Sequence, residues 1–158
     1  METTLSRKEL IKLAINGEKA SFALYSRAAV QASSEKVKTI FNHIARDELV
    51  HLFTLLGRFE RLYPELCNEV DILMPRPDEA EVRKLATVQE SAQALEWAIQ
   101  EEQKSLHFYL QLACVVEDKE ARMVLERIVR DETNHVRTLS SLGEEEINEA
   151  PVEERRFH

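Results

Sequence analysis

Apolar residues recur every three or four positions through the first sixty residues, the spacing that places them on one face of an α-helix. One such stripe covers residues 11–29 and a second covers residues 37–55. A Ser-x-x-Glu pattern that begins at Ser6 has the form of a capping box before the first stripe. The first helix is expected to end near residues 33–34, two serines that can cap the next helix, and the second before Pro64.

The same spacing returns in the second half of the chain, over residues 95–113 and 121–139. A second capping-box pattern, beginning at Thr87, predicts the start of the third helix. Asp118 is placed to cap the fourth helix, and Gly143 is expected to end it because glycine readily takes the conformation that follows a helix.

The two helical pairs are separated by a segment from about residue 64 to residue 88 that contains three prolines. It is too long for a turn, is long enough to run the length of a bundle, and could include a short helix over residues 79–85. The pattern therefore predicts an all-α fold, a four-helix bundle of two antiparallel helix hairpins joined by a long crossover. We expect residues 1–143 to form this single domain and the acidic residues 144–158 to be a flexible tail.

A polar pattern occurs twice along these helices without a gap. Each copy has a glutamate, then thirty residues later Glu-x-x-His, and the second copy lies 84 positions after the first (102 against 18). Each copy also has a tyrosine seven residues after its first glutamate, Tyr25 and Tyr109, and an aspartate before each Glu-x-x-His, Asp47 and Asp131. The six repeated residues are Glu18, Glu48, His51, Glu102, Glu132 and His135.

All four glutamates are predicted to meet at one level of the bundle. Each lies about 15 residues from the turn of its hairpin, roughly 22 Å at a rise of ~1.5 Å per residue. Each also interrupts an apolar stripe, and burying four carboxylates without cations would be very costly. Since no lysine or arginine lies on these stripes near the site, two metal ions are the simplest remedy. Carboxylates with one imidazole per ion favour iron or manganese, with zinc a common substitute, and leave positions open for dioxygen or peroxide.

Composition excludes several other classes of protein. At 158 residues, with three glycines and four prolines, the chain suits one helical domain. A net charge of −8 argues against nucleic acid as a partner, and no apolar run is long enough to cross a membrane. Two cysteines without a Cys-x-x-Cys motif argue against a disulfide framework or a cysteine-built metal site and fit a cytoplasmic protein.

The doubled motif resembles the ferritin-like di-iron carboxylate superfamily, in which two helices each give a glutamate and two others each give Glu-x-x-His. The likeness covers nearly all of residues 6–142, and the near-identical halves with a tyrosine in each most resemble the rubrerythrin-like group. The resemblance implies two iron ions with Glu18 and Glu102 as terminal ligands. It implies bridging roles for the second glutamate of each copy, with one histidine on each ion; these four residues are Glu48, Glu132, His51 and His135.

The same resemblance implies roles for the flanking residues. Asp47 would accept the free ring N–H of His135, and Asp131 that of His51; the alternative is a surface ion pair with the preceding arginine. Tyr25 and Tyr109 would hydrogen-bond ligand carboxylates or donate an electron or proton, the alternative being plain core aromatics.

Two departures separate the chain from typical rubrerythrins. Those proteins carry a second glutamate three residues after the third-helix ligand, where this chain has Ser105, matched by Ser21 in the first half. They also carry a rubredoxin domain with paired Cys-x-x-Cys motifs, which is lacking from this sequence. Any turnover would therefore need an external electron donor, such as a rubredoxin-like protein.

The resemblance implies a non-haem di-iron oxidoreductase that reacts with hydrogen peroxide or dioxygen. One alternative is a ferroxidase coupled to iron storage or transfer, and another is a non-catalytic bundle that metal only stabilises. Because rubrerythrin-like chains commonly pair, a homodimer is expected.

Overall fold

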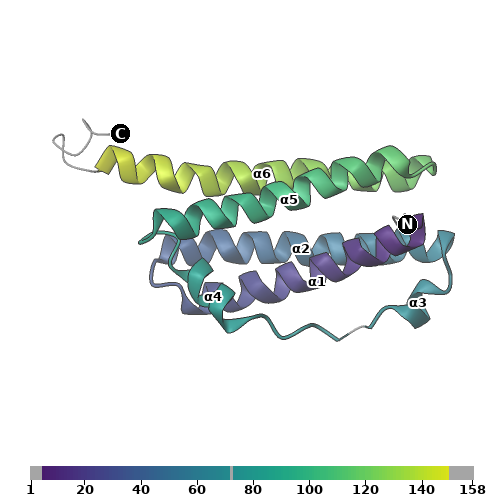
Figure 1. Ribbon diagram of the computed structural model, residues 1–158, viewed down its shortest axis with the longest axis horizontal. Coiled ribbons are helices and arrows are strands. Elements are labelled where there is room, and N and C mark those ends of the chain that lie inside the picture. Colours follow the sequence, from purple (N-terminus) through teal and green to yellow (C-terminus); the bar gives the residue numbers. More distant parts are fainter. Residues whose placement is uncertain (1–4, 72, 150–158) are drawn as a thin grey trace.

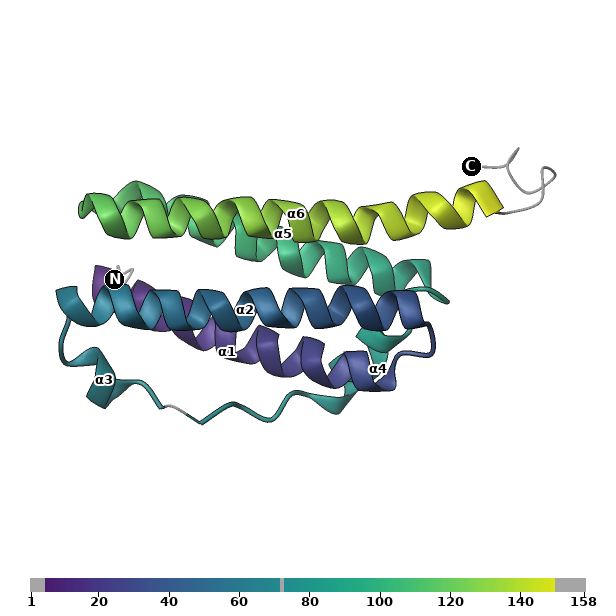
Figure 2. The same cartoon turned by 180° about the vertical axis from the view of Figure 1, so that it is seen from behind.

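Four long helices form the molecule in a computed structural model that describes residues 5–71 and 73–149 (Figure 1). They are α1 (Arg7–Gln31), α2 (Glu35–Leu62), α5 (Ala92–Val115) and α6 (Lys119–Glu149). Helix α1 packs chiefly on α2, and α5 packs chiefly on α6, so two antiparallel hairpins lie one on the other (Figures 1 and 2). The predicted all-α four-helix bundle of two hairpins is confirmed.

The predicted starts of three helices are confirmed by their caps. The backbone N–H of Glu9 donates to Ser6 Oγ at 3.3 Å, and the Ser6 N–H donates to Glu9 Oε2 at 2.7 Å, which completes a capping box. Ser34 accepts from the N–H of the third residue of α2. Asp118 accepts from the Ala121 N–H at 2.8 Å and so caps α6.

The predicted start of the third long helix is wrong by four residues. Thr87 ends a short helix instead, and its N–H donates to the carbonyl of Lys84 at 3.2 Å. Ser91 caps α5 by accepting from the Ala94 N–H at 3.2 Å. Thr87 and Ser91 are both residue types that can cap a helix, and Ser91 is the one that caps α5.

The predicted end of the fourth helix at Gly143 is also wrong, because α6 continues through Glu149. No glycine in the described ranges has a positive φ, so Gly143 does not take the conformation of a helix-ending residue. A Cβ placed there would lie 3.2 Å from a side-chain carbon of Leu95, so the glycine serves close packing of α6 against α5. The expected tail thus begins as six more helical residues, and its remainder, 150–158, lies outside the described residues.

The crossover runs along the bundle and contains α3 (Leu66–Glu69) and α4 (Glu79–Ala86), the latter being the predicted short helix (Figure 1). The expectation that no lysine lies on the inward stripes near the site is wrong, because Lys19 of α1 is buried. Its ammonium donates to the backbone carbonyl of Asp71, which ties the crossover to the first hairpin. Helix α4 packs on α1 and α5 through Val82 and Leu85. Within the described residues, none of the helices combines the length and apolar character that a bilayer span requires.

Candidate metal centre

The six repeated residues meet in the middle of the bundle. Each long helix contributes: Glu18 from α1, Glu48 and His51 from α2, Glu102 from α5, and Glu132 and His135 from α6. All six side chains belong to buried residues, with between 0% and 4% of their surface exposed. The apolar core is divided into two clusters, so these polar groups occupy the level at which the core is interrupted. The predicted convergence is therefore present.

The donor atoms form two overlapping groups of four residues. Glu18, Glu48, His51 and Glu132 make one group, and Glu48, Glu102, Glu132 and His135 make the other. Within each group, one donor atom from every residue lies within 4.8 Å of the others. Glu48 and Glu132 belong to both groups. A carboxylate has two oxygens, so each of these two glutamates can face both positions at once.

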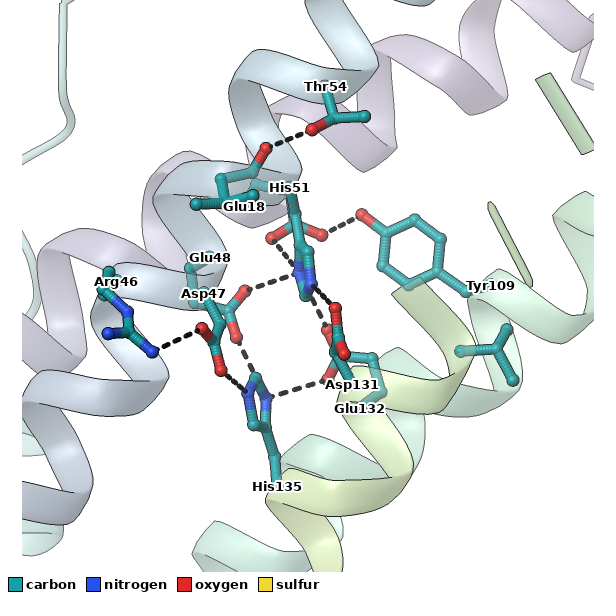
Figure 3. Close-up of polar contacts among 12 residues, drawn as sticks. Glu18, Arg46, Asp47, Glu48, His51, Thr54, Tyr109, Asp131, Glu132 and His135 are labelled. Atoms are coloured by element: carbon teal, nitrogen blue, oxygen red, sulfur yellow. Dashed lines mark hydrogen bonds and ion pairs between the residues drawn. The ribbon is translucent and has the colours of Figure 1, made fainter. Parts of the chain in front are cut away.

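Each histidine turns Nδ1 toward the carboxylates (Figure 3). His51 Nδ1 lies 3.4 Å from Glu18 Oε2 and 3.7 Å from Glu132 Oε1. His135 Nδ1 lies 3.3 Å from Glu102 Oε2 and 3.3 Å from Glu48 Oε1. The two ring centroids are 6.2 Å apart, so one imidazole serves each group.

Several inward-facing atoms of the site are buried and have no hydrogen-bond partner within the described part of the chain. They are Glu18 Oε2, Glu48 Oε1, His51 Nδ1, Glu102 Oε2, both oxygens of Glu132, and His135 Nδ1. Leaving a buried polar atom unpaired costs about 1–3 kcal/mol, so a cluster of them calls for missing partners. Divalent cations supply such partners, and carboxylate oxygens with imidazole nitrogens are a donor set that iron, manganese and zinc accept. The residues fit a two-metal centre.

The pKa values of the buried site residues also indicate that the site requires positive charge. Burial raises the pKa of Glu48 well above its usual range, and the nearby charges of Glu18 and Glu132 raise it further. Burial also raises the pKa of Glu132 to about 7. Burial by itself lowers the pKa of His135, but the carboxylates next to its ring, that of Glu102 first, outweigh burial, so that pKa is raised. Without cations, the site would hold protons that metals displace.

The outer nitrogen of each imidazole faces an aspartate of the opposite hairpin. His51 Nε2 lies 3.1 Å from Asp131 Oδ2, and His135 Nε2 lies 3.3 Å from Asp47 Oδ2, which are the two expected pairings. An Nε2–H that donates to the aspartate leaves Nδ1 free to bind a cation. The surface ion pair weighed as an alternative is present at Asp47, where Arg46 Nη2 lies 3.6 Å from Asp47 Oδ1.

Both tyrosines cross between hairpins to reach a glutamate. The Tyr25 hydroxyl donates to Glu102 Oε1, and the Tyr109 hydroxyl donates to Glu18 Oε1. Burial first, and then the charge of the accepting glutamate, raises the pKa of each tyrosine well above its usual value. Each hydroxyl therefore keeps its proton. The sequence indicated a bond to a carboxylate, but it did not indicate that each tyrosine bonds the glutamate of the other half.

A cavity of about 680 Å³ reaches the centre from one side, between α1, α5 and the crossover. It is lined by Glu18, Glu48 and Glu102 together with both tyrosines, whereas the two histidines lie beyond it. Sequence reasoning did not find this feature. Its outer wall is the crossover, whose position over the helices depends on packing that no local pattern encodes.

A buried centre of four carboxylates and two imidazoles in a four-helix bundle defines the class of ferritin-like di-metal proteins. Comparison with known families places the chain more narrowly: the sequence model described as rubrerythrin matches residues 9–143, and the chain belongs to the rubrerythrin family. Di-iron binding is usual in that family.

Two individual proteins are similar to this chain. The uncharacterized protein YhjR of Bacillus subtilis (strain 168) is 30% identical over 125 residues, which cover 79% of this chain and 78% of YhjR. A hypothetical protein from Pyrococcus furiosus has a solved structure that matches 87% of each chain with a TM-score of 0.69 and 23% sequence identity. At that identity, the likeness supports the fold alone.

Proposed function

We propose that this protein holds two iron ions and acts as a non-haem oxidoreductase that reacts with hydrogen peroxide or dioxygen. The observation that carries the proposal is the pair of overlapping donor groups, because Glu48 and Glu132 are common to both and can bridge two ions. Glu18 and His51 would complete one position, and the equivalent pair from the second hairpin would complete the other. Manganese or zinc could occupy the same donors.

Iron would supply the change of oxidation state that the side chains cannot. The protein would hold the ligands in place, keep them buried and supply protons from nearby hydroxyls. Asp131 and Asp47 hold the imidazoles by their outer nitrogens, which fixes the nitrogen that points inward. Tyr109 and Tyr25 hold a proton on a hydroxyl bonded to a site carboxylate, next to the cavity by which a small oxidant would enter.

The side of the site that faces the cavity differs from that of a typical rubrerythrin. Ser21 and Ser105 line the cavity one turn beyond Glu18 and Glu102, so no further carboxylate closes the centre there. We therefore place the reaction on the six-residue set alone, with electrons from an external donor such as a rubredoxin-like protein. The Asp47 and Asp131 side chains, on α2 and α6, are 35% and 34% exposed. An electron donor bound to this face would therefore lie close to the histidines that these aspartates contact.

Rapid mixing tests this proposal. The iron-loaded protein is reduced without oxygen and mixed with hydrogen peroxide or with dioxygen, and the rise of ferric absorbance is followed. Oxidation much faster than that of free ferrous ion, with two irons oxidised per chain, supports the proposal. A faster reaction with peroxide identifies a peroxidase-type centre, and a faster reaction with dioxygen that continues as more ferrous ion is added identifies iron oxidation. Rates equal to free ferrous ion with either oxidant contradict both.

A further inference from the structure

The cavity beside the centre is much larger than the proposed oxidants need. Its volume of about 680 Å³ is roughly twenty times the ~30 Å³ that a water molecule occupies in the liquid, and peroxide has only two heavy atoms. Pockets of about 300–1,000 Å³ are the usual size for organic ligands. The cavity is therefore large enough to hold an organic molecule.

The lining is mostly apolar, and small residues keep the inner part open. Leu24, Leu85, Trp97 and Phe108 give large apolar surfaces to the wall. Near the centre the wall is built from small residues: Ala14, Gly17, Ser21, Ala98 and Ser105. Gly17 is exposed and a Cβ added there would meet no atom within 4 Å, so the chain does not close the cavity at this point of its rim. The inner end of the cavity lies beside Glu18 and Glu102, which are themselves buried.

The edge of the cavity carries charges of both signs, with three acidic and two basic residues. Lys104 is paired with Glu101 at 2.6 Å, and Arg76 lies on the same lining as the acidic Asp78 and Glu81. Cations and anions are thus interspersed, and an ionic ligand would meet attraction and repulsion together. An uncharged molecule avoids this conflict and gains from burial against the apolar wall.

We propose that this cavity binds an uncharged, largely apolar organic molecule whose inner end lies beside Glu18 and Glu102. Binding needs only the cavity, but its consequence rests on the proposed function: the occupant would stand where peroxide or dioxygen reaches the centre. The bound molecule would therefore control access of the oxidant.

Trp97 provides a direct reporter, because it is the single tryptophan of the chain and lines the cavity. The Lys84 ammonium lies 4.6 Å from the centre of its ring, which helps to hold the indole in place. The probe is 4-bromotoluene, a neutral molecule whose bromine quenches indole fluorescence on contact, and toluene is the competitor without bromine. Saturable quenching of the protein as purified, reversed by toluene, is the expected result.

Two variants locate the binding. Ser105→Phe places a ring in the inner cavity and should weaken probe affinity at least tenfold, and Ser21→Leu is a smaller filling change in case the first fails to fold. Ser141→Phe is the matched control, because Ser141 is exposed on α6 and outside the cavity lining, and it should bind as wild type does. Folding of each variant is checked by thermal melting.

The inference is overturned if quenching is linear and no stronger than for free tryptophan amide, or if folded Ser105→Phe and Ser21→Leu bind the probe like the control. It is also overturned if probe binding disappears as the chain dimerises with rising concentration, since a second copy would then cover the cavity. Saturable binding in a protein that fails to react with peroxide or dioxygen would support the inference and remove the proposed function, so the two can fail separately.

Discussion

Glutamates that belong to both donor groups should matter twice as much to metal binding as those that belong to one. Glu132 belongs to both groups and Glu102 to one. We expect Glu102→Gln to keep about one metal per chain, in the group that contains His51, whereas Glu132→Gln should keep less than one. Glutamine preserves size and removes the charge, so the comparison isolates the loss of the carboxylate.

The size of the effect follows from linkage between binding and folding. A metal present at one hundred times its Kd stabilises the folded state by about 2.7 kcal/mol per site. For a chain of this length, ~1 kcal/mol shifts Tm by about 2–4 °C, which gives roughly 5–11 °C per occupied site. Adding metal should therefore raise the Tm of the wild type by roughly twice this amount. The Tm of Glu102→Gln should rise by the amount for one occupied site, and the Tm of Glu132→Gln should change little.

The assay is thermal melting of chelator-treated protein with and without added metal, followed by elemental analysis of desalted samples. Glu101→Gln is the matched control, because Glu101 adjoins Glu102 in the chain, pairs with Lys104 near the surface and is absent from both donor groups. It should behave as wild type. Equal losses of metal and of Tm shift in Glu102→Gln and Glu132→Gln would refute the idea of a shared, bridging carboxylate.

Three further predictions concern protons and supporting residues. In metal-free protein the pKa of Glu132 is about 7, against its usual value of 4.5, so between these pH values the folded state keeps a proton that the unfolded state releases. The urea midpoint should therefore fall as pH rises from 4.5 through 7, and a flat or rising midpoint would contradict this prediction. Tyr109→Phe removes the donor to Glu18 Oε1 and should lower the free energy of unfolding by about 1–3 kcal/mol while metal content stays at two, as urea titration with elemental analysis would reveal. Asp131→Asn should weaken metal binding at the His51 position about 10–100-fold in a competition with chelator, and unchanged affinity would mean that the aspartate does not support the imidazole.

Much of the fold could be predicted because its determinants are local. Apolar spacing and caps such as Ser6 and Asp118 act within one or two turns, so the sequence reveals them directly. The convergence of the six candidate ligands was predictable for a related reason. Equal distances from two turns put residues at equal heights, and the place of each on an apolar stripe turned it inward.

Features that depend on how separate helices meet were not predictable. Gly143 has the residue type of a helix end, yet it lies inside α6, at a point where a side chain of α5 approaches closely. The hydrogen bonds that Tyr25 and Tyr109 each donate to a glutamate of the other hairpin depend on how one hairpin sits on the other. The cavity depends on small residues of α1 and α5 together with a crossover that Lys19 anchors from a buried position.

Anomalous diffraction from crystals of the iron-loaded protein, measured at the iron absorption edge, addresses the central claim most directly. We predict two strong peaks per chain on either side of the Glu48 and Glu132 carboxylates, one next to His51 Nδ1 and the other next to His135 Nδ1. A single peak, or iron bound only outside the bundle, would contradict the two-metal centre.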